Sequence, residues 1–409
     1  MASGITLIQT PATHTPCFND QWFTATSSNT AQPNFQFYVT VTVYYHNGTT
    51  YTTAVDNEPC NTPPDGILRF NVRSYTENYI KHFVSYSTGW AKCTNGVLKV
   101  VVNVGERYGT TPAVTVGTNT TYYVWNAGLT YFDYGGYSAS NYVANNGSTF
   151  PILNNYPDAR VNPYSKTFLY ILCASDNVIS KARVTSTDGG AIPAISFFDI
   201  TNPLLASGNW YDRYLRLNVS PYSLAILGGA SWIGVPGTTY SISLYDNTNT
   251  IRKTVSFSYD DVCSKFFRYS IYYLNPKGAF DHFFFEKISN EKYSVEKTTV
   301  RHTPYSDPTG SGAMTYDATV ATTKVNTTSN NKSMVLRTDW ITETQSDTLK
   351  ELVFSPVAYL DEVQGSYTIF YPIINSDKNY VRNRNFNGKL FNLEANVDLA
   401  HTNYGQKGV

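Results

Sequence analysis

The sequence predicts a mainly β protein: tandem immunoglobulin-like β-sandwich domains followed by a C-terminal β-rich α+β domain with one short helix. Three observations lead to this fold class. Aromatic residues make up 15% of the chain and include 34 Tyr, whereas charged residues also reach only 15%. Aromatic and β-branched side chains fit the pleated surface of a strand, so this composition favours sheets. Short alternating runs are separated by Asn-, Gly- and Pro-containing turns, and one stretch has helical spacing.

A chain of 409 residues is too long for one small core and suits several domains. We expect a β-sandwich domain over 1–109, a Tyr/Gly/Asn-rich linker or interface loop over 110–149, a second β-sandwich over 150–265, and a C-terminal β-rich domain over 266–409. The boundaries follow changes in composition, because the segment 110–149 is dominated by Thr, Asn, Gly and Tyr.

The first domain is predicted from a hairpin. Residues 35–43 alternate between apolar and polar side chains, which indicates one buried face. Asn47-Gly48 follows, and Asn-Gly is a strong hairpin signal because both residues tolerate positive φ. The return strand is expected at 49–55. Further strands are expected at 67–72 and 96–104, with a helical turn at 76–83 capped by Ser74 or Thr76.

The segment 110–149 is predicted to be a contact surface. Its aromatic residues Trp125, Tyr131, Tyr134 and Tyr137 are candidate interface residues, since a polar loop that carries exposed aromatic rings makes contacts more often than it forms a core. In the second domain, strands are expected at Phe168–Cys173, 215–219, 240–244 and Ile251–Tyr259, with a turn at 246–249.

The most patterned stretch is 269–287, YSIYYLNPKGAFDHFFFEK. Asn275-Pro276-Lys277-Gly278 is a turn signal, because Pro presets φ and Gly accepts positive φ. The aromatic runs on either side predict a hairpin, and the continuous run Phe283-Phe284-Phe285 predicts that both faces are covered.

The single helix is predicted near 342–354. Thr342 and Gln345 form a capping-box pair, and Pro356 ends the helix. Trp340 precedes the cap, where we expect a buried ring that anchors the start of the helix. Strands are expected at 367–374 and 389–399.

The hairpin and the residues that follow it resemble a family of structural tail and collar proteins of tailed bacteriophages that infect Bacteroidetes, crAss-like phages included. The resemblance lies in Tyr273-Leu274-Asn275, Gly278, Phe280-Asp281 and Phe283, then in the basic, Thr-rich stretch 292–302, the Gly-rich loop 306–312, Asp339-Trp340-Ile341, and a strand that starts at Ser355-Pro356. It covers the last third of the chain well and the first two thirds loosely.

This resemblance implies a virion structural protein without catalysis or cofactor. Such a protein would be a subunit of the tail, collar ring or baseplate, made in the host bacterial cytoplasm. Its expected partners are other virion proteins and copies of itself in a homo-oligomeric ring. An alternative function is a carbohydrate-binding receptor module that takes a host glycan as its partner.

The sequence offers little support for other chemistry. The six His residues lack metal-ligand spacing, so no metal site is expected. The adjacent acids Asp260-Asp261 and Asp361-Glu362 point to opposite faces of a strand, which disfavours a catalytic pair. Thirty basic and thirty acidic residues leave no excess charge for nucleic acid. Neither a secretory signal nor a membrane span is expected, and the five Cys indicate thiols in a reducing compartment.

Overall fold

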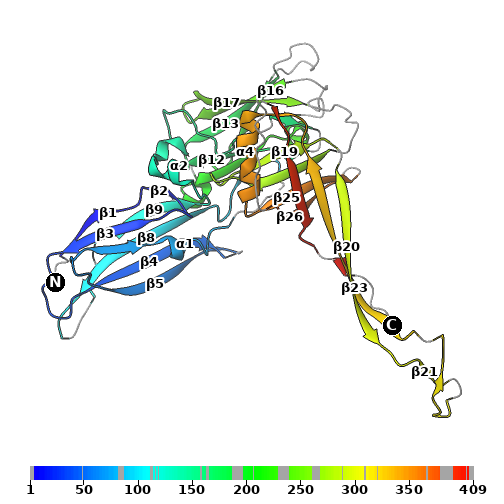
Figure 1. The fold of residues 1–409 in the computed structure, drawn as a ribbon. Helices are drawn as coiled ribbons and strands as arrows, with labels where there is room; N and C mark the ends of the chain where they lie inside the picture. Colours follow the sequence, from blue (N-terminus) through cyan, green and yellow to red (C-terminus); the bar gives the residue numbers. More distant parts are fainter. Residues whose placement is uncertain are drawn as a thin grey trace. The chain divides into compact units, whose positions relative to one another are not determined.

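The structure is a computed structural model in which the chain divides into two compact units. Unit 1 comprises Met1–Val262 and Leu274–His282, and unit 2 comprises Cys263–Tyr273 and Phe283–Val409. The chain is mainly β with few helices, as the sequence predicts (Figure 1). The described residues are 4–47, 49–81, 87–110, 114–115, 117, 119–156, 159–162, 165–186, 197–205, 207–228, 239–259, 268–287, 289–307, 310–319, 321–364, 367–377, 390–401 and 403–404.

Unit 1 contains a first pair of packed sheets. One sheet has the order β1 (Ile5–Gln9), β3 (Trp22–Ser27), β6 (Leu68–Asn71), and the other has the order β2 (His14–Pro16), β9 (Asn119–Trp125), β8 (Val97–Arg107), β4 (Gln36–His46), β5 (Tyr51–Asn61). Their inward side chains form one core: Phe23 comes from the first sheet, and Val41 and Val100 come from the second. This is the sandwich packing that the alternating residues predict.

The predicted N-terminal hairpin is confirmed. β4 and β5 pair from Gln36↔Asn61 to His46↔Tyr51, and the Asn47 side chain accepts hydrogen bonds from the backbone of Thr49 and Thr50. The predicted helical turn begins earlier than expected. Helix α1 spans Arg73–Thr76 without a side-chain cap from Val72. Instead, the Asn71 carboxamide oxygen accepts from the Arg73 backbone N–H at 3.1 Å, which fixes the start of the turn.

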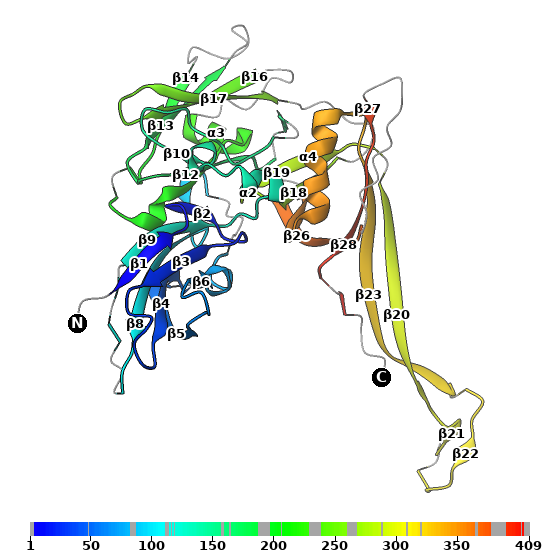
Figure 2. The same cartoon turned by 60° about the vertical axis from the view of Figure 1, so that its left-hand side comes forward.

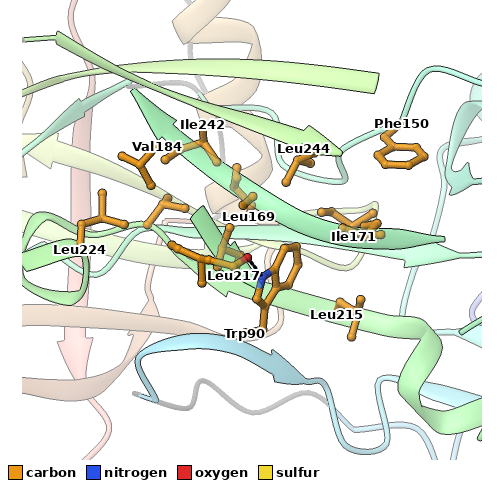
Figure 3. Close-up of a cluster of buried hydrophobic side chains, with 14 of the residues drawn as sticks. Trp90, Phe150, Leu169, Ile171, Val184, Leu215, Leu217, Leu224, Ile242 and Leu244 are labelled. Carbon is orange, nitrogen blue, oxygen red and sulfur yellow. Dashed lines mark hydrogen bonds between the residues drawn. The ribbon is translucent and has the colours of Figure 1, made fainter. Parts of the chain in front are cut away.

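A second pair of sheets completes unit 1. The first has the order β10 (Val143–Ala144), β12 (Phe168–Cys173), β15 (Tyr214–Asn218), β7 (Gly89–Lys92), and the second has the order β11 (Arg160–Val161), β17 (Ile251–Tyr259), β16 (Thr239–Asp246), β13 (Ile179–Ser186), β14 (Phe197–Thr201). Figure 3 shows the core between them, where Leu169 and Leu217 face Ile242 and Leu244. Trp90 packs there and donates its Nε1–H to the Ile200 carbonyl at 3.1 Å.

The sheets interleave along the chain, which corrects the expected linker at 110–149. β7 precedes β8 in sequence but joins the second sandwich, whereas β9 pairs with β8 in the first. The expected linker therefore contains β9, helix α2 (Tyr131–Gly135), the 3₁₀ helix η1 (Ala139–Asn141) and β10. β9 forms a strand because Tyr122 and Val124 alternate into the core. Two further short helices of unit 1 are η2 (Trp210–Arg213) and α3 (Pro221–Gly228).

Unit 2 is built on an eight-stranded sheet covered by helix α4 (Glu343–Phe354), whose Leu349 and Leu352 pack in the core. The strand order is β19 (Phe280–Phe285), β18 (Tyr269–Leu274), β25 (Ala358–Gln364), β26 (Tyr367–Asn375), β28 (Glu394–Leu399), β23 (Thr323–Arg337), β20 (Asn290–Arg301), with β29 (Asn403–Tyr404) also on β23. Of the hairpin β18–β19, the segment Leu274–His282 belongs to unit 1. The predicted hairpin is thus confirmed, and all its strand residues are buried.

The capping box of α4 is confirmed: the Thr342 hydroxyl accepts from the Gln345 N–H, and the Gln345 side chain accepts from the Thr342 N–H at 2.9 Å. The strand expected at 389–399 is instead two strands, β27 (Leu390–Phe391) and β28. β27 pairs with β24 (Ile341–Thr342), and β28 pairs with β23. The chain changes partner at Leu393, whose N–H donates to the Thr338 hydroxyl at 2.8 Å.

Candidate functional site

The turn of the β18–β19 hairpin, Leu274–His282, is called the hairpin tip below. Asn275 closes it, since its side-chain oxygen accepts from the N–H groups of Lys277 and Ala279, both at 3.0 Å. Gly278 has φ +94°, and a Cβ at this position would lie 2.1 Å from the Asn126 carbonyl oxygen. Only glycine therefore fits here without displacing the backbone of its neighbour.

The carbonyl groups of the hairpin tip are used by other parts of unit 1. The Pro276 carbonyl accepts from the Gly128 N–H at 2.9 Å, and the Lys277 carbonyl accepts from Trp125 Nε1–H at 3.1 Å. The Gly278 carbonyl accepts from the Tyr214 hydroxyl at 2.5 Å. These bonds hold the tip in the interior, where an unpaired carbonyl would be costly.

Asp281 is a buried carboxyl at the centre of a hydrogen-bond network in unit 1. It accepts from the Asn275 side chain at 2.8 Å, from the Asn155 backbone N–H at 3.1 Å and from the Asn154 side chain at 3.2 Å. Burial raises the pKa of Asp281, although these donors favour its ionised form. The neighbouring His282 is also buried, with Nε2 3.1 Å from the Arg160 carbonyl. Asp281 and Asn275 thus have structural roles.

The candidate interface residues of 110–149 separate into two groups. Trp125 is fully buried, which corrects its expected place on a surface; its ring lies 6.2 Å from Tyr137. Tyr134 and Tyr137 are half-buried, because their hydroxyls donate to the carbonyls of Asp20 and His14. Tyr131 is 87% exposed, as expected, and its neighbour Phe132, which sequence analysis missed, is 88% exposed.

Trp340 is 60% exposed, which corrects the expectation of a buried ring. The buried position before the cap is taken by Ile341, which lies in the core of unit 2. Trp340 lies in the bend before β24, whereas Ile341 is the first residue of that strand and packs in the core. Pro356 lies just beyond the end of α4 and is exposed. Trp340 is therefore a surface aromatic residue of unit 2.

Unit 2 has an exposed two-stranded ribbon, called the β-arm below. It consists of β20, of the part of β23 that precedes its pairing with β28, residues 323–332, and of β21 (Tyr305–Ser306) and β22 (Thr315–Tyr316) at its distal end (Figure 2). All twelve residues of β20 are exposed. The basic, Thr-rich stretch 292–302 carried part of the family resemblance, but the arm was not predicted, because its Thr, Lys and Asn residues lack an apolar face that would mark its length.

Catalytic and metal chemistry has few candidates in the described part of the chain. No cluster of three or more His, Cys, Asp or Glu side chains that could hold a metal is found among those residues. Asp361 is buried and accepts from the Tyr272 hydroxyl at 3.4 Å. Asp260, Asp261 and the Glu362 side chain lie outside the described residues.

Cys17, Cys60, Cys93 and Cys173 are free thiols, and Cys263 lies outside the described residues. Burial raises the pKa of the Cys17 thiol to about 12, so this group is a poor nucleophile. Every described helix falls short of the length and apolar character needed to cross a membrane.

The chain matches no protein-family model, and no curated protein sequence matches it.

Proposed function

We propose that the chain is a non-enzymatic structural protein of a tailed-phage virion, a subunit of the tail, collar ring or baseplate region that assembles with copies of itself and with other virion proteins. The observation that carries this proposal is the β-arm. A two-stranded ribbon without a packed face is marginally stable in water. Because the arm is exposed along much of its length, a neighbouring subunit is the simplest source of its missing stabilisation.

The side chains of the β-arm support an assembly role. Large apolar residues are exposed along both of its strands and at its distal end: Tyr293, Val295, Val300, Tyr305, Met314, Tyr316 and Val325. Among the strands that the structure describes, β20 is also the last of its sheet, so its outer backbone groups are available to another chain. An exposed ribbon with apolar side chains and a free edge is the kind of surface through which subunits join.

The hairpin tip supports the family resemblance on which the phage assignment rests. Three residues of the motif have definite structural roles. Asn275 closes the turn, Gly278 adopts the positive φ that the turn requires, and Asp281 organises the buried network. A motif maintained by packing and hydrogen bonds is consistent with an architectural protein.

Removal of the β-arm tests the proposal. β20 and β23 pair Tyr293 with Lys332, so residues 294–331 can be replaced by Asn-Gly while the base of the ribbon keeps its register. We expect the shortened protein to keep the fold of unit 1 and to lose assembly, as measured by light scattering and electron microscopy. Tyr131→Ser with Phe132→Ser is a control that removes an equally exposed aromatic surface. Particles that assemble normally without the arm would refute this function.

One observation favours the carbohydrate-binding alternative. Tyr131 and Phe132 lie side by side on α2, with ring centroids 5.9 Å apart and both rings almost fully exposed. Exposed aromatic faces can stack on sugar rings. A glycan array with the intact chain tests this function: binding that disappears in the Tyr131→Ser, Phe132→Ser variant would support it, and an empty array would remove it.

A further inference from the structure

The outer edge of β20 has a sequence that is complementary to itself. Its central residues are Glu291-Lys292-Tyr293-Ser294-Val295-Glu296-Lys297. Two residues at the same distance on either side of Ser294 carry opposite charges when they are charged at all. On one edge of β20 lies β23, and among the described residues no strand occupies the other. We propose that β20 pairs antiparallel with the β20 of a second copy of this chain, about a two-fold axis at Ser294.

The charges fix this register. With Ser294 opposite Ser294, Lys292 faces Glu296 of the second copy and Glu291 faces Lys297, and the two-fold axis repeats both contacts. Opposite charges directly across an antiparallel pair are favourable, and like charges are unfavourable. All four side chains are on exposed positions of the strand. One alignment of the free edge therefore places four pairs of opposite charges across the contact. Glu291 also bonds to Lys332 of its own chain at 3.0 Å, so the two Lys292–Glu296 pairs are the ones that form without rearrangement.

The uncharged positions fit the same alignment. Tyr293 lies opposite Val295 of the second copy, again twice, and both side chains are more than half exposed in the single chain, at 58% and 53%. Aromatic and β-branched side chains form favourable cross-strand pairs. The contact would thus cover apolar surface on one face of the ribbon while it pairs charges.

Neighbouring alignments lose this complementarity. A two-fold axis keeps the same faces of the two strands on the same side of the pair. The axis can therefore shift only from one residue to the next, and its nearest alternative positions are Tyr293 and Val295. When the axis passes through Tyr293, Lys292 faces Ser294 and Glu291 faces Val295. When the axis passes through Val295, Lys292 faces Thr298 and Glu296 faces Ser294. In each case every charged side chain of the set faces an uncharged one. The charges therefore favour a single register between the two copies.

The same residues argue for a second copy over a different protein. A strand that must bind another partner has no need to be complementary to itself, whereas an isologous contact requires it. Lys292 and Glu296 also have no ion pair within the described chain, so both are available. This contact rests on the proposed assembly function and extends it by identifying one of the surfaces through which copies join.

A charge swap on the full-length protein tests the contact. K292E alone places a carboxylate opposite Glu296 of the second copy, and E296K alone places two ammonium groups together. We expect each single variant to raise the dimer dissociation constant on the order of tenfold, and the double variant K292E/E296K to restore it. K324E is the matched control, because Lys324 lies on β23, away from this edge.

Crosslinking provides a second measurement. In the proposed register, Ser294→Cys brings the two introduced thiols directly opposite each other, whereas Thr298→Cys leaves them about 27 Å apart. A short bis-maleimide should join copies of the first variant and not of the second, with the wild type as the background for native thiols. Equal crosslinking of both variants, or a double charge variant as weak as the single ones, would overturn the self-pairing. If the wild type assembles in those experiments, the proposed assembly function stands without the β20 self-pairing. A wild type that stays monomeric at all concentrations would count against both the self-pairing and the assembly function.

Discussion

At the scale of single residues, Gly278 is a position where the structure has no room for a side chain. An added Cβ would meet the Asn126 carbonyl oxygen at 2.1 Å, and φ is +94°. We predict that Gly278→Ala costs more than about 2 kcal/mol, since a positive φ and an overlap must both be relieved. Chemical denaturation of the purified variant measures this loss. Lys277→Ala, one residue away, keeps the backbone hydrogen bonds of the turn and loses the bond from Lys277 Nζ to Asn155 Oδ1 at 2.6 Å, so it should cost less than Gly278→Ala.

His14 is a second residue with a testable consequence. Burial, helped by the nearby charge of Arg213, lowers its pKa to about 4, and its ring stacks on Tyr123 at 5.3 Å. A group whose folded pKa lies below its unfolded value of about 6.5 stabilises the fold above pH 6.5 and loses this contribution as pH falls toward 4. The loss is on the order of 3 kcal/mol.

The variant His14→Phe keeps a stacking ring and removes the titration. We expect its melting temperature to fall less than that of the wild type between pH 7 and pH 4.5. Calorimetry at several pH values provides the comparison. Parallel pH dependences of the two proteins would mean that His14 is not the group that titrates.

At the scale of elements, helix α4 illustrates a local signal that decides a boundary. The Thr342 hydroxyl and the Gln345 side chain each bond to the backbone of the other residue. We predict that Thr342→Ala lowers the stability of unit 2 by about 1 kcal/mol, because an N–H of the first turn loses its acceptor. Thermal unfolding measures the change. Thr342→Ser, which keeps a hydroxyl, should remain close to the wild type.

Strand predictions succeeded where alternation or continuous apolar residues marked a buried face. β4, β12, β17 and the hairpin β18–β19 are of this kind. β9 was missed, because its Thr, Tyr and Asn residues give it the composition of a loop, and only two of its side chains, Tyr122 and Val124, show the alternation of a strand. β13 was missed because Lys181 and Arg183 mask its buried Ala182 and Val184. Local composition thus identifies strands with an apolar face better than strands with charged outer faces.

The site residues divide in the same way. The turn chemistry of Asn275 and Gly278 follows from sequence alone, because backbone angle and turn closure are local properties. Of the donors to Asp281, Asn275 is close in sequence, but Asn154 and Asn155 lie far away, so nothing local could identify those two. Trp125 was misplaced for the same reason: its Nε1 partner is the Lys277 carbonyl, 152 residues away. Long-range partners decide whether a polar or aromatic residue is buried.

At the scale of the whole molecule, one hairpin belongs to both compact units. Its tip, Leu274–His282, is part of unit 1, whereas Cys263–Tyr273 and Phe283 onward are part of unit 2. The strands β18 and β19 are continuous through this division. A disturbance at the tip therefore acts on a segment that both units need, whereas a change at Thr342 or His14 acts within one unit.

We predict that Asp281→Ala destabilises both units together. The substitution removes the acceptor of three donors, on Asn275, Asn154 and Asn155, of which the first two lie on buried side chains. Leaving such donors unpaired costs about 1–3 kcal/mol each. Differential scanning calorimetry should show every unfolding transition shifted to lower temperature, whereas Thr342→Ala shifts only the transition of unit 2. An Asp281→Ala protein in which one transition stays at its wild-type temperature would show that the unit concerned folds without the hairpin tip.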